Sequence, residues 1–447
     1  MTTFQNDLFR GLGSALNILQ SCADPAPFFD TILRGCLHNT TYDMQCEGDR
    51  GWYLHQAAKL SGNESAVEEA VRQKFFRIKD DAWLFNQMCS ILYHFAVDGS
   101  ETARNTLYQQ YENMLLKLSR KRKYEQICHQ RDMFEWLCVW LCSLDGWSTF
   151  KKIVDDISGL LLTKNKDFFF MEWFNSNSES KFGKKRVLQY LQKQSQKSTY
   201  IRTYYEKAIE WDTRFFGERP IPTLNEVLEA AKKPFSGRGI SMRFARNASL
   251  EDLEELAQAA IGELDAGIQT ELLWAFRRNN RYAFPEEFLL KLSQSADEKL
   301  RSLAYDMMGV NPSGKTRELA RDLIQSGSEV KNGVYLLTRN LLPEDEELLY
   351  DMVKAIRPRK YESYWHHVYM CADEGIKIMR GKPKTDILEF IYRNTLCGYC
   401  RESLVRTMYK KGVLSDEVLR ECRFDANSNV RKFAERIIRN QNRRRKD

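Results

Sequence analysis

Cysteine and histidine spacings are the first places where this sequence could carry out chemistry. Cys397-Gly-Tyr-Cys400 has the CxxC spacing of half a metal site or of a redox pair. His367 and Cys371 are four residues apart, so on a helix they would share one face, as two metal ligands do. The sequence nearby does not complete either ligand set. We therefore favour a chance spacing for the CxxC and packing roles for His367 and Cys371, and we predict no metal and no cofactor.

Motifs of known catalytic sites are also scarce. The sequence contains no G-x-G-x-x-G, H-E-x-x-H or G-x-S-x-G motif, and its six histidines form no paired signature. Gly314-Lys315-Thr316 ends like a phosphate-binding loop, but we assign no first glycine of a G-x-x-x-x-G-K-[ST] motif before it. No strand is predicted before it either, and it is predicted to begin a helix. We expect no phosphate site there, no catalytic residues and no small-molecule substrate. Carboxylates that came together from different repeats would escape this search.

The elements that would hold any site are predicted to be helices. In Asp425–Asn440, apolar residues recur at offsets of 0, 3, 4, 7 and 8, which places them on one stripe of a helix. Ser295–Gly309 repeats the scheme, and in both stretches an arginine follows the first apolar residue (Arg301, Arg431). A hairpin of two such helices cannot bury its apolar stripe alone, so neighbouring hairpins must stack. We predict burial at the junctions for the residues that centre the stripes: Leu303, Ala304, Phe433 and Ala434.

Twelve helices are predicted between residues 249 and 440, with glycine and proline in the breaks. Ser249 and Asp252, three residues apart, predict a capping box at the start of the first of these helices. They form six hairpins with a period of about 32 residues. Their second helices resemble those of the HEAT and HEAT-like repeat family, in Asp297…Leu300-Arg301…Ala304 and in Asn427…Val430-Arg431…Ala434. The resemblance implies an α-solenoid in which this arginine bonds to the preceding turn. It implies little about function, because the family includes scaffolds, carriers, regulators and a few enzymes.

The whole chain is predicted to be all-α, with about twenty helices in four segments. Residues 1–211 form a less regular helical-repeat half, in which Gly62–Phe75 and Gly99–Glu112 align on Gly-x-Glu-Ser/Thr-Ala. Residues 212–248 concentrate proline and glycine and are predicted to be a joint with one helix near 223–232. The HEAT-like repeats at 249–440 and a basic tail at 441–447 complete the scheme.

Composition limits the class of protein. The longest nearly uncharged apolar stretch, Trp136–Leu144, is far shorter than the ~18 residues that a membrane span needs. The chain begins without a basic segment followed by a long apolar one, so no secretion signal is predicted. Its eleven cysteines are an odd number, which fits reduced thiols. We expect an intracellular, cytoplasmic protein that does not bind membranes.

Charge is unevenly distributed along the chain. Residues 164–208 contain ten Lys and Arg against four Asp and Glu, whereas residues 249–271 contain seven acidic residues and no basic one. Basic residues interleaved with aromatic ones could bind nucleic acid, with cations on phosphates and rings on bases. For the aromatic stretch Phe168–Phe174 we favour a core position. Six basic residues remain candidate contacts with nucleic acid or with an acidic partner: Lys121, Arg122, Lys123, Lys184, Lys185 and Arg186.

The sequence favours a non-enzymatic interaction or scaffold protein whose concave face binds a macromolecule, with protein favoured over nucleic acid. Stacked hairpins expose a long curved face and no deep pocket, which suits a macromolecular partner. The alternative is a nucleic-acid-binding solenoid, similar to the HEAT-like alkylpurine DNA glycosylases, although no motif carries their catalytic positions onto this chain. A structural part of a larger assembly would have the same sequence features.

Overall fold

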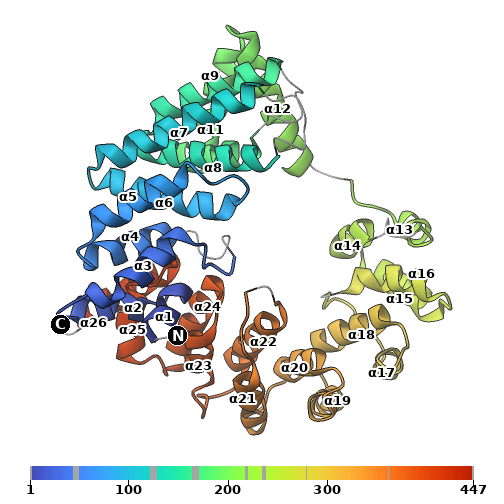
Figure 1. The fold of residues 1–447 in the computed structure, drawn as a ribbon. Helices are drawn as coiled ribbons and strands as arrows, with labels where there is room; N and C mark the ends of the chain where they lie inside the picture. Colours follow the sequence, from blue (N-terminus) through green and yellow to red (C-terminus); the bar gives the residue numbers. More distant parts are fainter. Residues whose placement is uncertain are drawn as a thin grey trace. The chain divides into compact units, whose positions relative to one another are not determined.

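The computed structural model describes residues 3–43, 50–120, 128–163, 171–216, 220–233, 238–277, 279–360 and 362–444. These residues form twenty-six α-helices and a few short 3-10 turns, and they contain no strand (Figure 1). The all-α prediction is confirmed, but the predicted count of about twenty helices is too low. The repeat period was extrapolated over the first 248 residues, where fourteen helices occur and several are only eight or nine residues long. No described helix is long and apolar enough to cross a membrane.

The chain divides into two compact units. Unit 1 comprises residues 1–218, 396–402 and 415–447, and unit 2 comprises residues 219–395 and 403–414. Unit 1 therefore takes residues from both predicted halves of the chain, and the predicted division into segments stays a prediction. Helix α24 (Gly398–Lys411) begins in unit 1 and continues in unit 2.

Unit 1 is built mainly of long helices that pack in sequence order. Its core is a continuous cluster of buried apolar side chains that runs from Phe4 to Ala208 and includes Ala426. Aromatic rings stack within it, for example Phe75 on Phe85 with centroids 4.6 Å apart. Its helices are α1 (Thr3–Arg10), α2 (Gly13–Ser21), α3 (Phe29–Leu37), α4 (Arg50–Leu60), α5 (Glu64–Phe75), α6 (Ala82–Val97), α7 (Glu101–Arg120), α8 (Cys128–Asp145), α9 (Trp147–Thr163), α10 (Glu172–Phe182), α11 (Lys184–Ser195), α12 (Thr199–Phe216), α25 (Asp416–Cys422) and α26 (Ser428–Arg444).

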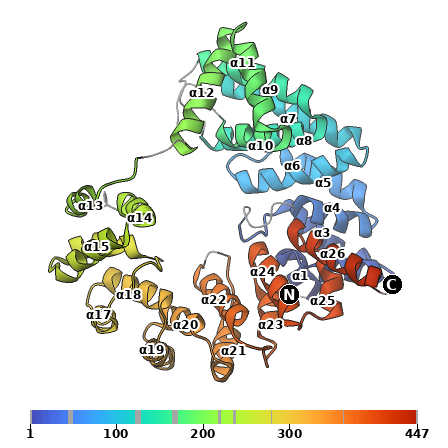
Figure 2. The same cartoon turned by 180° about the vertical axis from the view of Figure 1, so that it is seen from behind.

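The two ends of the chain meet inside unit 1, where α25 lies beside α2 and α26 packs on α25 (Figures 1 and 2). The amide of Ala426 donates to the carbonyl of Gly11 at 2.9 Å. Arg401 donates to the carbonyl of Arg10 at 2.9 Å and forms a fully buried ion pair with Asp425, with its Nε 2.8 Å from Oδ2. A backbone hydrogen bond and the contacts of the Arg401 guanidinium therefore both join the end of the chain to its beginning.

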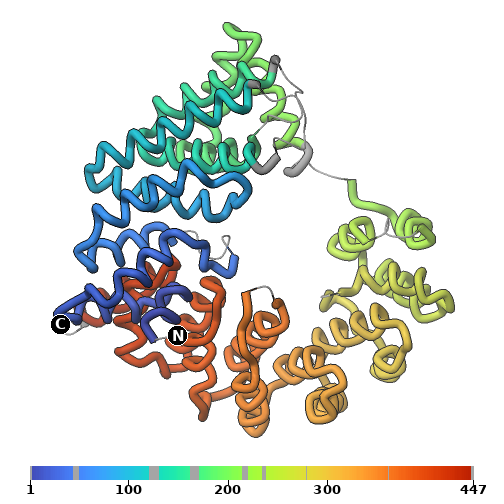
Figure 3. The backbone as a smooth tube through the Cα atoms, in the orientation of Figure 1, coloured from blue at the N-terminus to red at the C-terminus, as the bar shows by residue number. Residues whose placement is uncertain are grey.

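Unit 2 is a succession of short helical hairpins (Figure 3). Helices α16, α18, α20 and α22 contact one another in turn and form one row, while α17, α19 and α21 form a second row (Figure 1). Its helices are α13 (Leu224–Ala231), α14 (Arg238–Asn247), α15 (Leu250–Gly262), α16 (Ala266–Leu273), α17 (Glu286–Leu292), α18 (Glu298–Val310), α19 (Gly314–Gln325), α20 (Val330–Arg339), α21 (Glu346–Ala355), α22 (Tyr364–Ile378), α23 (Ile387–Asn394) and the end of α24.

Local sequence signals account for these helices. The twelve helices predicted between residues 249 and 440 correspond one to one to α15–α26, with most ends shifted by a few residues. The predicted capping box at the start of α15 is present, because the Ser249 side chain accepts from the Asp252 amide and the Asp252 side chain accepts from the Ser249 amide. The four residues predicted to centre the stripes are all buried: Leu303, Ala304, Phe433 and Ala434.

Arg301 and Arg431, which follow the first apolar residue of each stripe, make the same kind of hydrogen bond. Arg301 donates from Nη1 to the carbonyls of Ser295 and Ala296, at 2.9 and 3.1 Å. Arg431 does the same to Asp425 and Ala426, at 2.6 and 3.2 Å. Each arginine thus satisfies carbonyls of the turn before its own helix, as the HEAT resemblance implied for this position.

Candidate functional site

Three of the six predicted basic contacts lie in the described residues, together on the first turn of α11. Lys184 pairs with Asp212, with Nζ 2.5 Å from Oδ1. Arg186 lies over the ring of Trp147, with Cζ 4.4 Å from the centroid. Lys185 is exposed. The other three predicted contacts, Lys121, Arg122 and Lys123, lie outside the described residues.

Only the end of the aromatic stretch Phe168–Phe174, from Met171 on, lies in the described residues, and it is divided between core and surface. Of its described residues, Met171 and Phe174 are buried, as predicted, whereas Trp173 is 54% exposed and lies against Trp136 with centroids 5.8 Å apart. The amide of Phe174 donates to the buried carboxyl of Glu135 at 2.8 Å. Glu135 therefore holds the start of α10, and burial raises the pKa of this carboxyl to about 7.

The cysteine and histidine spacings fall on helices. His367 and Cys371 lie one turn apart on α22, with Nε2 and Sγ 3.5 Å apart. Burial raises the pKa of the Cys371 thiol to about 12, so this thiol is protonated near neutral pH and is a poor nucleophile. Cys397 and Cys400 lie at the start of α24, and both are buried. The expectation that neither pair holds a metal stays a prediction.

The stretch Gly309–Thr316 needs a correction to the sequence analysis, because it carries the full G-x-x-x-x-G-K-T spacing of a phosphate-binding loop. Its setting is different, since it joins α18 to α19 with no strand before it. The Lys315 ammonium pairs with Glu287 at 2.8 Å and with Glu286 at 3.3 Å. These carboxylates place negative charge where a phosphate would have to bind.

Gly309 has a packing role that accounts for the first glycine of this pattern. A Cβ on Gly309 would lie 2.5 Å from the ring of Tyr335 on α20. The glycine therefore allows α18 and α20 to approach closely. Ser313 accepts from the Thr316 amide at 3.1 Å and so caps α19, and its hydroxyl donates to Glu286.

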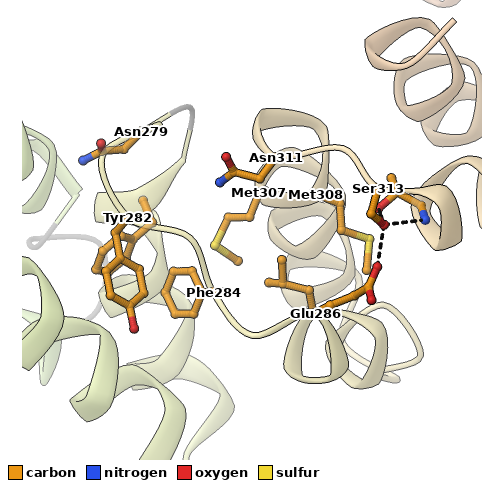
Figure 4. A pocket seen from close by; sticks show the side chains of 11 residues that line it. Asn279, Tyr282, Phe284, Glu286, Met307, Met308, Asn311 and Ser313 are labelled. Atoms are coloured by element: carbon orange, nitrogen blue, oxygen red, sulfur yellow. Dashed lines mark hydrogen bonds between the residues drawn. The ribbon is translucent and has the colours of Figure 1, made fainter.

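A cavity of about 260 Å³ lies beside this turn, between the loop that follows α16 and the helices α17 to α19 (Figure 4). Aromatic and methionine side chains make up its apolar wall, and short polar side chains surround it. The lining residues are Phe276, Asn279, Tyr282, Phe284, Glu286, Leu289, Met307, Met308, Asn311, Ser313 and Thr316.

The loop that forms one wall of this cavity is held in place by Arg281. Its guanidinium donates to the carbonyl of Ala248 at 2.6 Å and to that of Ala245 at 3.3 Å, at the end of α14. The rings of Tyr282 and Phe284 then meet edge to face, with centroids 5.0 Å apart. The opposite wall is Met307 and Met308 of α18 (Figure 4).

Charges near the cavity are paired across successive hairpins. Arg277 binds Asp306 at 2.7 Å, Arg301 binds Glu329 at 2.9 Å, and Arg317 binds Asp345 at 2.7 Å. The partners lie 28 or 29 residues apart. These pairs were not predicted from the sequence, although opposite charges that recur at nearly the repeat period are a signal that could have revealed them.

Comparisons with known proteins assign this chain to no family. No protein-family model matches it, and no curated protein matches it. One solved structure, an engineered protein from the Northeast Structural Genomics Consortium, aligns over 98% of this chain and 99% of its own, with 13% identity and a TM-score of 0.23. A TM-score this low carries no argument about fold or function.

Proposed function

We propose that this protein is a non-enzymatic helical-repeat protein that binds a partner protein. In this proposal residues 249–440 form a HEAT-like α-solenoid, and the cavity of Figure 4 takes one large apolar side chain of the partner. The observation that carries the proposal is the composition of this cavity. Aromatic rings and flexible methionines adapt to apolar side chains of different shapes, and buried anchor residues supply much of the binding energy of protein interfaces.

The size of the cavity also favours a side chain as its occupant. At about 260 Å³ it lies just below the usual range of small-molecule pockets, ~300–1,000 Å³. Asn279 and Asn311 could bond to the partner's backbone around an inserted side chain, which is the arrangement of an apolar centre with a polar rim.

The paired charges of unit 2 favour a protein partner over nucleic acid. Nucleic-acid binding draws much of its affinity from cations that are free to neutralise phosphates. In unit 2, Arg277, Arg301 and Arg317 are already bound to carboxylates of the next hairpin. Freeing them would cost those ion pairs, so a neutral apolar anchor is the better match to this surface.

The cellular setting is part of the proposal. The nine cysteines whose side chains are described are free thiols, which fits a reducing compartment such as the cytoplasm.

The proposal can be tested by selecting a displayed library of random peptides against the full chain. We expect enrichment of peptides that share one large apolar residue. Tyr282→Ala removes one wall and Asn311→Trp fills the cavity, so each should weaken the selected peptides by about tenfold. Tyr409→Ala, which truncates a half-exposed tyrosine on α24, is the matched control and should leave binding unchanged. Selected peptides that bind all three variants equally would refute the proposal.

Nucleic acid remains the second candidate because Lys184, Lys185 and Arg186 stand together on the first turn of α11. The positive end of the helix dipole adds to their charge. If they bind phosphates, replacing all three by Glu should weaken binding to every sequence alike, and affinity should fall steeply with salt. Under the protein-binding proposal, the wild-type chain should not shift a labelled duplex or single strand at physiological salt. A salt-sensitive shift that the triple variant abolishes would replace our proposal with this one.

A further inference from the structure

We propose that unit 2 holds a second binding site, which takes an organic cation in the form of a guanidinium or primary ammonium group. The site is a cavity of about 390 Å³ at the start of α16 and α18, beside the end of α13. Its occupant would be an arginine or lysine side chain of the partner, and in that respect it rests on the proposed function. Its lining residues are Ala231, Lys232, Arg238, Asp265, Gly267, Ile268, Thr270, Glu271, Asp297 and Lys299.

The carboxylate of Glu271 is the centre of this site. The residue is only 6% exposed and it lines the cavity. Its Oε1 accepts from the Nε of Arg238 at 3.2 Å, but no described donor reaches its buried Oε2. A buried carboxylate oxygen without a donor is costly, and a cationic donor is the group that would stabilise it most.

Arg238 is held in a geometry that leaves Oε2 open. Its guanidinium carbon lies 4.4 Å from the ring centroid of Trp274, and Arg277 lies 4.6 Å from the same centroid. Arg277 is fixed in turn by Asp306, at 2.7 Å. Stacking on Trp274 thus fixes the Arg238 guanidinium, which reaches Oε1 of Glu271 through Nε and leaves Oε2 without a donor.

The charges around the cavity favour a cation over an anion. Two of the three basic lining residues have acidic partners, since Lys232 is engaged by Glu229 at 2.5 Å and Arg238 by Glu271 at 3.2 Å. The third is Lys299, and three carboxylates line the same cavity, those of Asp265, Glu271 and Asp297. Residues 249–271, which lead into the site, contain seven acidic residues and no basic one. An anion that entered would meet the Glu271 carboxylate, whereas a cation would be attracted by the same field.

The test uses fluorescein-labelled pentapeptides with arginine or lysine at the centre and glycine and serine elsewhere. The control peptide carries citrulline, which has the shape of arginine without its charge. Binding to the full chain is measured by fluorescence anisotropy, and unlabelled agmatine serves as a free small-molecule cation in competition. We expect arginine or lysine to bind at least about tenfold more tightly than citrulline, as the loss of a charged hydrogen bond implies.

Two variants and one control locate the effect. Glu271→Gln keeps the side-chain shape and should remove the preference for the cationic peptide. Gly267→Leu, at an exposed position on the cavity lining, should block the site without touching Glu271, so it serves if Glu271→Gln fails to fold. Glu255→Gln removes an exposed charge of the same acidic segment and should change affinity less than about twofold.

The outcomes distinguish this site from the proposed function. Equal binding of the arginine and citrulline peptides, or equal effects of Glu271→Gln and Glu255→Gln, would overturn the cation site. Displacement of the arginine peptide by agmatine that is lost in Glu271→Gln supports the site and shows that the cationic group alone is enough for binding. Because these probes carry no large apolar side chain, their failure leaves the cavity of Figure 4 untouched, and failure of the Tyr282 and Asn311 variants leaves this site untouched.

Discussion

Unit 1 and unit 2 are both built of helices, but different interactions hold their helices together. In unit 1, α7, α8, α9 and α12 have 17 to 20 residues each, and rings stack between helices, as Tyr111 does on Phe134 at 5.2 Å. In unit 2, α16 and α17 have only 8 and 7 residues, and arginine–carboxylate pairs join successive hairpins. Short helices bury less apolar surface, so charge pairs and loop contacts carry more of the packing.

The difference indicates which unit is suited to binding. Both cavities discussed above lie in unit 2, at the ends of α16 and α18, where loops and helix termini and not long helix faces form the walls. Unit 1 contains an ion pair in which both side chains are fully buried, Arg401 with Asp425, and this pair makes its stability sensitive to single changes. In our proposal, recognition lies mainly in unit 2, and unit 1 contributes mainly stability.

The largest effect is expected from breaking the buried ion pair of unit 1. Asp425→Ala leaves the Arg401 guanidinium fully buried without its carboxylate, which should cost about 3–5 kcal/mol of unfolding free energy. Lys184→Ala, which removes a partly exposed pair of the same unit, should cost less than about 1 kcal/mol. Urea denaturation measures both. Similar losses in the two variants would show that burial of the pair does not matter.

A second large effect is expected where the two ends of the chain touch. A Cβ on Gly13 would lie 1.8 Å from the carbonyl oxygen of Glu421, so Gly13→Ala must push α2 away from α25. We expect a loss of about 3 kcal/mol, at the upper end for overpacking. Gly159→Ala, whose Cβ would meet no atom within 4 Å, should be neutral or stabilising by up to about 1 kcal/mol. The measurement is the melting temperature of both variants. A Gly13→Ala variant that melts at the wild-type temperature would contradict the close contact between α2 and Glu421.

The next effect is a pH dependence with opposite signs at two buried groups of unit 1. Burial lowers the pKa of His55 to about 4, although Asp98 pulls it up. The unfolded chain therefore binds a proton that the folded chain does not, and stability should fall as the pH drops from about 6.5 to 4. Burial raises the pKa of Glu135 to about 7, so its contribution is present at low pH and is lost as the pH rises from about 4.5 to 7.

These two contributions can be separated by variants. We expect the wild-type unfolding free energy to fall by about 2–3 kcal/mol on acidification because of His55, and this fall should be absent in His55→Gln. A fall of similar size between pH 4.5 and 7 is expected from Glu135, and it should be absent in Glu135→Gln. The measurement is the unfolding free energy from pH 4 to 7.5. Parallel curves for wild type and both variants would show that neither group titrates differently in the folded chain.

The smallest effect is expected in unit 2. Arg301→Ala removes the pair with Glu329 and the bonds to the carbonyls of Ser295 and Ala296, all of which are partly exposed. We expect a loss of about 1 kcal/mol that shrinks at 0.5 M salt. Denaturation at two salt concentrations measures it. A loss as large as that of Asp425→Ala would erase the proposed difference between the units.

Short-range patterns in the sequence predicted local structure, whereas contacts between residues far apart in the chain were not predicted. The stripes on α18 and α26 and the capping box at Ser249 involve residues within one or two turns, so spacing alone revealed them. Arg401 bonds to the carbonyl of Arg10 across 391 residues, and no periodic pattern links such positions. The cavity of Figure 4 is formed by a loop and three helices. Tyr282 is part of a cavity only because these segments pack together, so the sequence alone could not single it out.

Photo-crosslinking of a selected peptide tests the assignment of recognition to unit 2 most directly. The peptide's apolar anchor residue is replaced by benzoylphenylalanine, the complex with the full chain is irradiated, and the attachment points are mapped by mass spectrometry. We expect crosslinks at Tyr282, Met307 and Met308, and their loss in the Asn311→Trp variant. Crosslinks that map instead to α11 around Lys184–Arg186, or that persist in Asn311→Trp, would contradict the account.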